Sequence, residues 1–294
     1  MIIPDKDSVT DAVLDEMRRT PDPRTHEILA ALVRHLHAFV MEVRLTEPEF
    51  HRAIQYVNAI GKATTPSHNE AMLLAGALGV SNLVCLMNNA AHDSTGTHAN
   101  TLGPFWRAGA PLTKNGESIV RSPTPGPALH VKGWVRDAQG RPIPGAQIDV
   151  WEASPAGLYE NQDSSQADMN LRGRLETESD GSFSFRSVKP SGYPIPTEGP
   201  TGDLLRAQGR HPFRPAHVHF LIYKAGFKTI SSQIYDADDP NLATDSQFGV
   251  TNALVGNYIK QPDGSFSLEF NFVLQAGESV LPKPPISGKA ESPR

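Results

Sequence analysis

The chain of 294 residues contains a single cysteine, Cys85, and no nearly apolar run longer than Ala71 to Val80. One cysteine cannot form an internal disulfide or a Cys-x-x-Cys metal or redox site, and it is typical of a reducing compartment. The apolar run is too short to cross a hydrocarbon layer of about 30 Å. The N-terminal residues also lack the apolar core of a signal peptide. These absences predict a cytoplasmic protein without a membrane span.

An excess of positive charge is absent as well. The sequence has 27 Lys and Arg against 32 Asp and Glu, which gives a formal net charge of −5, and the two signs are mixed along the chain. A nucleic-acid-binding protein would be expected to carry a basic patch, so we expect no nucleic-acid partner. Hydrophobic residues make up 38% of the chain, enough for a sizeable core and too many for a disordered or fibrous protein.

Glycine and proline are scarce in the first hundred residues, which contain 9 of them, whereas the other 194 contain 40. Apolar residues recur there with the period of a buried helical stripe from Ile28 to Val43. Capping boxes at Thr46–Glu49 and Ser67–Glu70 begin two more helical segments, which reach Gly61 and Met87. The first part of the chain is therefore predicted to contain three helices.

The hydrophobic period falls to two from about Leu129 onward. Residues 129–135 and 148–152 alternate on either side of a turn, and residues 266–274 alternate without interruption. Short strands joined by loops rich in proline and glycine are typical of an antiparallel β-sandwich.

The change of period gives the expected domain organisation. We expect an α+β protein with an N-terminal helical domain over residues 1–108 and a β-sandwich over residues 109–281. Residues 282–294 are expected to form a flexible tail.

Two histidine pairs have His-x-His spacing. His35 and His37 lie in the first helical stripe, where a step of two residues turns by about 200° and points the side chains to different sides. His217 and His219 lie in a predicted strand, where residues two apart point to the same face. The second pair is therefore the one that could share a metal ion, although two histidines on a solvated sheet face fit the bare pattern as well.

Arg214 precedes this pair and favours metal binding. Pro215 holds Arg214 in an extended conformation, which keeps a permanent cation near both imidazoles. A nearby cation disfavours imidazole protonation, and the neutral form is the one that binds metals.

Two kinds of side chain could complete a metal site. A carboxylate with the two histidines would form a ferrous or zinc site, and the candidates are Glu198, Asp203 and Asp236. Tyr159 and Tyr193 lie in rigid loops, and phenolate, with a free pKa near ~10, needs a strongly Lewis-acidic ion such as ferric iron. The residues alone leave both kinds open.

Six spaced motifs then resemble those of a known family, the intradiol ring-cleaving dioxygenases of the catechol and hydroxyquinol 1,2-dioxygenase group. The resemblance extends from about residue 46 to residue 275. The motifs are LLxxxLGxS at 73–81, LGPFW at 102–106, GxPxPGAxIDVWxAxxxGLYxNQ at 140–162, NLRGR at 170–174, YPIPxxGPxGxLLxxxGRHPFRPAHVHF at 193–220 and SSQIYDxxD at 231–239.

The resemblance implies a ligand set and a reaction. It implies one non-haem Fe(III) per subunit, and the ligands would be Tyr159, Tyr193, His217 and His219. Tyr193 would leave the iron and take a substrate proton, and Arg214 and Gln233 would stabilise charge on the ring. Both atoms of O2 would enter a catechol-type ring to give a cis,cis-muconate or maleylacetate-type product.

The resemblance also implies a substrate pocket, lined by Leu73, Gly76, Thr101, Leu102, Gly103, Pro104, Phe105, Ile195, Pro196 and Gln247. Hydroxyquinol enzymes usually have aspartate where this chain has Gly76. Glycine removes one polar partner for a third hydroxyl and is expected to enlarge the pocket, which predicts tolerance of a substituted ring.

Partners and competing interpretations complete the sequence-based prediction. The family resemblance implies a homodimer through the N-terminal helices, with phospholipid bound between them. One alternative is a non-catalytic transthyretin-like binding module, since residues 131–151 also resemble the start of such sandwiches. Another is a zinc or Fe(II) metalloenzyme that uses the same histidine pair.

Overall fold

A computed structural model describes residues 2–89 and 96–288. The chain divides into two compact units, Met1–Asn58 and Ala59–Arg294. The predicted helical segment from Ser67 to Met87 therefore lies in the same unit as the sheets. The domain boundary at residue 108 stays a prediction.

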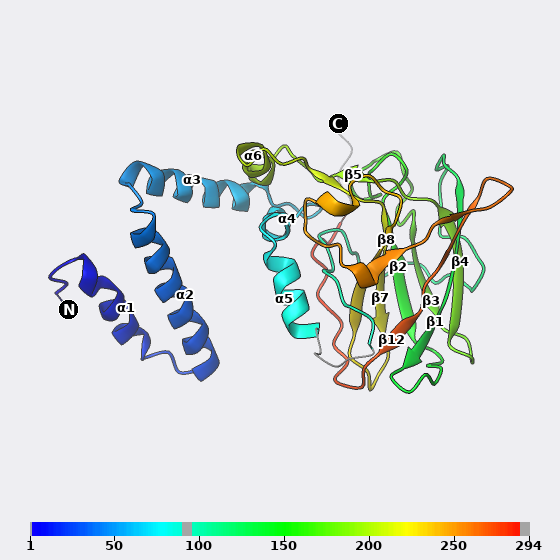
Figure 1. Cartoon of the computed structure of the whole chain (residues 1–294), viewed down its shortest axis with the longest axis horizontal. Coiled ribbons are helices and arrows are strands. Elements are labelled where there is room, and N and C mark those ends of the chain that lie inside the picture. Colours follow the sequence, from blue (N-terminus) through cyan, green and yellow to red (C-terminus); the bar gives the residue numbers. More distant parts are fainter. Residues whose placement is uncertain (1, 90–95, 289–294) are drawn as a thin grey trace. The chain divides into compact units, whose positions relative to one another are not determined.

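The N-terminal unit is helical, as predicted (Figure 1). Its elements are η1 (Lys6–Ser8), α1 (Val9–Met17), α2 (Pro23–Glu42) and the first part of α3 (Glu47–Ala63). Asp22 caps α2 by accepting a hydrogen bond from the Thr25 amide at 2.7 Å. The predicted box before α3 is present in part, because Glu49 Oε2 accepts from the Thr46 amide at 2.9 Å.

The prediction of the third helix is wrong in two respects. It is divided into α4 (Glu70–Ala77) and α5 (Val80–Asn89), which meet at an angle of 76°. Gly79 separates them with a φ of +73°, a left-handed conformation that glycine adopts without strain. The N-cap of α4 is Asn69 rather than Ser67, since the Asn69 side chain accepts from the Met72 amide.

The helices of the described residues are short or amphipathic. Among these residues no single helix is long and apolar enough to cross a bilayer. Only the two helices α4 and α5 taken together, despite the bend between them, are long and apolar enough for a span.

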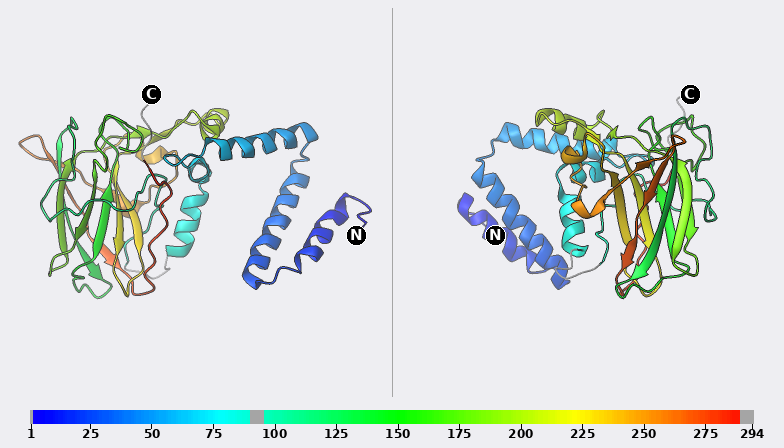
Figure 2. Two further views of the ribbon diagram at one scale, coloured as in Figure 1. Left: turned by 180° about the vertical axis from the view of Figure 1, so that it is seen from behind. Right: turned by 45° about the vertical axis from the view of Figure 1, so that its right-hand side comes forward.

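The second unit contains the strands, and the α+β class is confirmed. One five-stranded sheet has the order β10-β11-β1-β12, with β4 also paired to β1, and the other has the order β3-β2-β7-β8-β9. Figure 2 shows these strands from two further sides. The elements are β1 (Ala128–Asp137), β2 (Gln147–Trp151), β3 (Arg172–Glu176), β4 (Ser182–Val188), β5 (Tyr193–Pro194), α6 (Pro200–Ala207), β6 (Phe213–Arg214), β7 (His217–Tyr223), β8 (Ile230–Asp236), η2 (Leu242–Thr244), η3 (Asn252–Leu254), β9 (Val255–Gly256), β10 (Ile259–Lys260), β11 (Phe266–Glu269) and β12 (Phe272–Leu274).

The sheets are mixed rather than purely antiparallel. β1 pairs in parallel with β11 and β12, and β8 pairs in parallel with β9. The chain reaches these strands by long connections instead of hairpins, so alternation alone could not give their direction. The expected single strand 266–274 is broken at Phe270 and Asn271, opposite Gly133, where a Cβ atom would lie 1.9 Å from the Phe270 carbonyl oxygen.

The main core lies between the two sheets. It includes Val131 and Phe183 from one sheet and Val218 and Phe220 from the other. Because residues alternate along β7, the opposite face of that strand carries His217 and His219. The core thus fixes the strand that presents the histidine pair.

Part of the expected flexible tail is packed. Ile286 is only 3% exposed, and the Ser287 amide donates to the Pro66 carbonyl at 3.0 Å. Residues 289–294 of the predicted tail lie outside the described residues.

Candidate active site

The two histidines of β7 face one another through their Nε2 atoms, which lie 3.1 Å apart. His217 Nδ1 lies 2.7 Å from the Pro215 carbonyl oxygen and therefore carries the proton, which leaves the Nε2 lone pair directed into the site. Burial and then the Arg214 guanidinium lower the pKa of His217 to about 3. Burial and then His217 lower the pKa of His219 well below its usual value, so both imidazoles are neutral.

Two tyrosine hydroxyls complete this cluster of donor atoms. Tyr159 Oη lies 3.1 Å from His219 Nε2 and 3.0 Å from Tyr193 Oη. Tyr159 comes from the loop after β2, whereas Tyr193 begins β5. Gly157 lets the two loops approach, because a Cβ atom there would lie 2.9 Å from Tyr193 Cβ.

The chemistry of these donors fits a strongly Lewis-acidic cation. Burial raises the pKa of Tyr159 and of Tyr193, so both phenols would be neutral at physiological pH without a cation to stabilise the phenolate. The set thus combines two neutral imidazole nitrogens with two phenolic oxygens, which are hard donors once they are deprotonated. Such a set fits ferric iron.

The competing carboxylate sites are not formed. Among the described residues no group of three His, Cys, Asp or Glu side chains is placed to hold a metal ion. Asp236 is instead paired with Lys189, and Asp203 pairs with Arg206 on α6 at 2.6 Å. The histidine pair therefore has tyrosines, not carboxylates, as its neighbours.

Arg214 lies beside the histidines and is fixed by four partners. Its guanidinium donates to Asp245 Oδ1 at 3.0 Å, Gln233 Oε1 at 2.9 Å and Tyr235 Oη at 2.8 Å, and its fourth contact is with His217 Nε2 at 3.3 Å. Burial lowers the pKa of Arg214, but the Asp245 carboxylate outweighs this and raises it well above its usual value. The guanidinium is a permanent, oriented cation.

Two members of this network were missed by sequence analysis. These are Tyr235 and Asp245. Tyr235 lies opposite His217 in the register of β7 and β8, just as the predicted Gln233 lies opposite His219, so the same two-residue step could have identified Tyr235. Asp245 lies in a loop after η2, where no periodicity indicates its role.

A second layer of side chains supports the donor cluster. The Trp151 ring stacks on the His219 imidazole with centroids 4.6 Å apart and planes 9° from parallel. The Arg172 guanidinium lies 5.9 Å from the Tyr159 ring centre and donates to Glu160 Oε2 at 2.5 Å. These contacts fix the orientation of two of the four donors.

A cavity of about 260 Å³ opens beside the donor cluster. All the predicted pocket residues line it except Pro196. Tyr193 and Arg214 also line the cavity, whereas Tyr159 does not. Lining residues missed from sequence are Met72, Ser81, Val84, Cys85 and Asn100.

The expected enlargement of the pocket at Gly76 is wrong. A Cβ atom on Gly76 would lie 1.8 Å from Gln247 Oε1, so the Gln247 amide already fills that space. The glycine makes room for another side chain rather than for a larger substrate.

The β7 histidines and the two tyrosines thus form one donor cluster beside a cavity. Comparison with known proteins identifies the class. Residues 101–276 match the family described as "Dioxygenase", and residues 22–96 match "Catechol dioxygenase N terminus".

Relatives of known activity are similar in sequence to this chain over most of its length. A 6-chlorohydroxyquinol 1,2-dioxygenase of Cupriavidus pinatubonensis is 39% identical over 92% of this chain and 97% of its own length. A hydroxyquinol 1,2-dioxygenase of Rhizobium sp. is 40% identical over 89% of this chain and 88% of its own. The crystal structure of hydroxyquinol 1,2-dioxygenase from Pseudomonas putida superposes with a TM-score of 0.84 at 37% identity, covering 92% of this chain and 99% of that one.

The chain therefore belongs to the intradiol ring-cleavage dioxygenases. It is an oxidoreductase of the catechol and hydroxyquinol 1,2-dioxygenase class. Membership of this family implies a non-haem iron.

Proposed function

We propose that the protein holds one Fe(III) per subunit through Tyr159, Tyr193, His217 and His219 and opens a hydroxylated aromatic ring between two adjacent hydroxyls. The observation that carries the proposal is the convergence of two imidazole nitrogens and two phenolic oxygens within 3.1 Å of their neighbours. Ferric iron supplies the chemistry that lets a bound diol react with O2. Both oxygen atoms enter the product, a cis,cis-muconate or maleylacetate-type diacid.

Tyr193 is the donor that exchanges with substrate. Tyr193 lines the cavity, whereas Tyr159 does not. Burial raises the pKa of the Tyr193 phenol, so its oxygen, once deprotonated, would be a strong base that could take a proton from a substrate hydroxyl at Oη. Tyr159, which is enclosed and lies under Arg172, keeps its place in the donor set.

Arg214 and Gln233 prepare the cavity for charge on the ring. The guanidinium lines the cavity and keeps its charge through Asp245. Gln233 accepts from Arg214 and donates to the Thr101 carbonyl at 2.7 Å, which ties the cation to the cavity wall. A fixed cation in a water-poor site stabilises negative charge that develops on the substrate.

Tyr193→Phe tests the assigned base. We expect kcat to fall by about 10²–10⁴-fold because proton transfer to Oη is lost, while iron remains bound by the other three donors. Steady-state kinetics and iron analysis of the purified variant measure this. Tyr223→Phe, at the end of β7, is the matched control, and an unchanged kcat in Tyr193→Phe would place the base elsewhere.

Product analysis tests the reaction itself. The iron-loaded protein is incubated with catechol or hydroxyquinol under ¹⁸O₂, and the product is identified by mass spectrometry and NMR. We expect a diacid that carries two labelled oxygen atoms and a red-brown protein before the reaction. A colourless protein, an extradiol semialdehyde or a diacid without ¹⁸O would refute the proposal.

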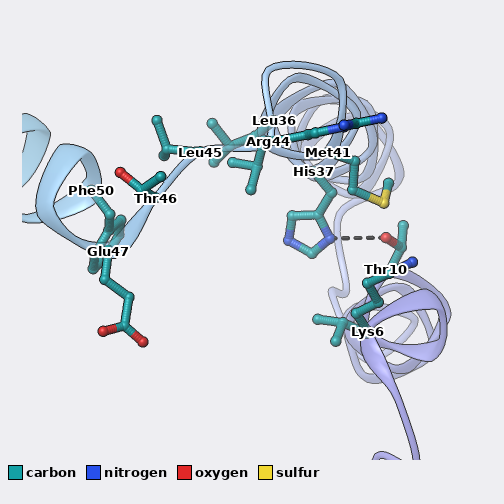
Figure 3. A pocket seen from close by; sticks show the side chains of 12 residues that line it. Lys6, Thr10, Leu36, His37, Met41, Arg44, Leu45, Thr46, Glu47 and Phe50 are labelled. Carbon is teal, nitrogen blue, oxygen red and sulfur yellow. Dashed lines mark hydrogen bonds between the residues drawn. The ribbon is translucent and has the colours of Figure 1, made fainter.

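The N-terminal helices carry the proposed partner surface. Exposed apolar side chains on α2 include Ile28, Leu32, Leu36 and Phe39. A pocket of about 1030 Å³ lies among α1, α2 and the start of α3, and Lys6 and Arg44 add two cations to its mostly apolar wall (Figure 3). We propose that a second copy covers this apolar surface and that a phospholipid occupies the pocket, with its acyl chain on the apolar wall and its phosphate near the cations.

The dimer and the lipid have separate measurements. Light scattering should give twice the mass of the chain, and organic extraction followed by mass spectrometry should release phospholipid. A monomer at micromolar concentration would refute the dimer, and a lipid-free extract from freshly purified protein would refute the lipid.

A further inference from the structure

The C-terminal segment, defined here as residues 285–288, packs into the apolar layer around the donor cluster. Its Ile286 is 3% exposed and belongs to the same buried apolar cluster as Trp151, Tyr159 and Tyr193. Two of these three residues are donors, and the third stacks on a donor imidazole. The end of the chain therefore contributes a side chain to the surroundings of the candidate iron site.

Hydrogen bonds hold the C-terminal segment against the α3–α4 connection, residues 64–69. The Ser287 amide donates to the Pro66 carbonyl at 3.0 Å, and the next amide donates to the same oxygen at 3.2 Å. Asn69 Nδ2 donates to the Pro285 carbonyl at 3.4 Å. Because these bonds lie on both sides of Ile286, they fix the backbone that carries it.

The same connection also holds the loop of Tyr159. Asn161, two residues after Tyr159, donates from Nδ2 to the Ser67 carbonyl at 3.2 Å. Its Oδ1 accepts from Arg172 Nη2 at 3.0 Å. The C-terminal segment and the Tyr159 loop are thus bonded to consecutive residues, Pro66 and Ser67, so a displaced segment would loosen the support of that loop.

The apolar layer controls how water reaches the donors. Tyr159 is 0% exposed and Tyr193 is 4% exposed, so surrounding side chains exclude solvent from both rings. A metal ion leaves its site more easily when water can replace a donor, and the polarity around a ligand changes its electronic properties. Ile286 comes from a chain end, where local opening breaks few contacts, so it is the member of the layer that opens at the lowest cost.

We propose that the C-terminal segment closes the donor cluster against water and that Ile286 is a positioning residue for the iron site. It slows the release of iron and keeps the surroundings of the Tyr159 phenolic oxygen apolar, although it donates no ligand itself. The inference rests on the proposed iron site and adds a residue from the end of the chain to its support.

The first test opens the layer in the full-length, iron-loaded protein. Ile286→Ala is mixed with a strong Fe(III) chelator, and the loss of visible absorption gives the rate of iron release. We expect release to be about 10–100-fold faster, in line with the loss of other supporting residues around metal sites. Val280→Ala, at a side chain that is 60% exposed, is the matched control, and Ile286→Val should restore slow release.

The absorption spectrum before the chelator is added gives a readout that stability alone would not move. Water that hydrogen-bonds to a phenolate oxygen lowers the energy of the electrons that the oxygen donates. The visible band of Ile286→Ala should therefore shift to shorter wavelength. Leu129→Ala, in the core between the sheets, should destabilise the fold but leave both the band and the release rate unchanged.

A second variant tests the path of the segment without altering Ile286. Ser287→Pro removes the amide that donates to Pro66 and should also accelerate iron release. Ser287→Ala keeps that amide and is the matched control.

The outcomes separate this inference from the proposed function. If the unaltered protein holds no iron, the proposed function fails. If it holds iron, the inference is refuted by release from Ile286→Ala within about 2-fold of the unaltered rate, the change expected of a surface substitution. An unshifted band in Ile286→Ala, or an equal acceleration in Leu129→Ala, refutes it as well, and in each of these cases the proposed function stands.

Discussion

The helical N-terminal unit and the second unit, which contains the strands, differ in how far they bury their apolar side chains. In α2 only Ala30 is buried, and Leu32 and Phe39 remain 57% and 51% exposed. In β7 every residue from His217 to Ile222 is buried. The second unit therefore buries its own core beside the donor cluster, whereas the N-terminal unit leaves exposed the apolar side chains that we propose a second copy covers.

The largest expected effect distinguishes the two His-x-His pairs. His217→Ala should lose iron, colour and activity together, with a fall in kcat of more than about 100-fold, because a donor is removed from the cluster. His35→Ala, on the exposed face of α2, should change none of these. Metal analysis, visible absorption and kinetics provide the comparison, and a His217→Ala protein that retains iron and colour would remove His217 from the ligand set.

A core substitution gives the next largest effect. Phe220 is fully buried, with the Phe272 ring 5.0 Å away, so Phe220→Ala should lower the free energy of unfolding by about 3–5 kcal/mol at every protein concentration. Phe39→Ala should lower it only at concentrations where a partner covers the ring. Urea denaturation over a hundredfold range of protein concentration measures both. An equal, concentration-independent loss in Phe39→Ala would contradict the contrast between the units.

A buried carboxyl group gives an effect that is the smallest when it is measured over a single pH unit. Burial raises the pKa of Glu152 to about 8 in the folded protein, from 4.5 when it is free, although Ser187 donates a hydrogen bond to it. The folded state then binds more protons than the unfolded state between these values. The group's contribution to stability is full below pH 4.5 and is lost as the pH rises through 8, at up to about 1.4 kcal/mol per pH unit.

Glu152→Gln should remove this part of the slope. Denaturation at a series of pH values between 5 and 8 measures it, with Glu42→Gln at the exposed end of α2 as the control. The same slope in Glu152→Gln as in the unaltered protein would show that the carboxyl is already ionised in the folded state.

Periodicity predicted the elements of both units better than it predicted their connections. Alternation in β7 placed His217 and His219 on one face and Val218 and Phe220 on the other, as observed. It could not give the direction of β11 and β12 or the break between them, which depend on a close approach to Gly133. The split between α4 and α5 depends on the conformation of one residue, Gly79, within a continuous apolar run.

The candidate site divides in the same way. Motifs indicated the four donors, Arg214 and Gln233, because each lies at a characteristic spacing from its neighbours. The roles of Asp245 and Gln247 come from a loop that has no period, and Gly76 alone could not reveal that a distant amide fills its space. Long-range packing of this kind is not encoded in local patterns.

The stacking of Trp151 on His219 would let tryptophan fluorescence report metal binding at the donor cluster. Only three tryptophans occur in the chain, and one lies with its ring 4.6 Å from an imidazole of the donor cluster. An absorbing ferric centre at that cluster would quench the indole emission by energy transfer. Fluorescence titration could then follow loading of the protein in real time, without a dye or a label.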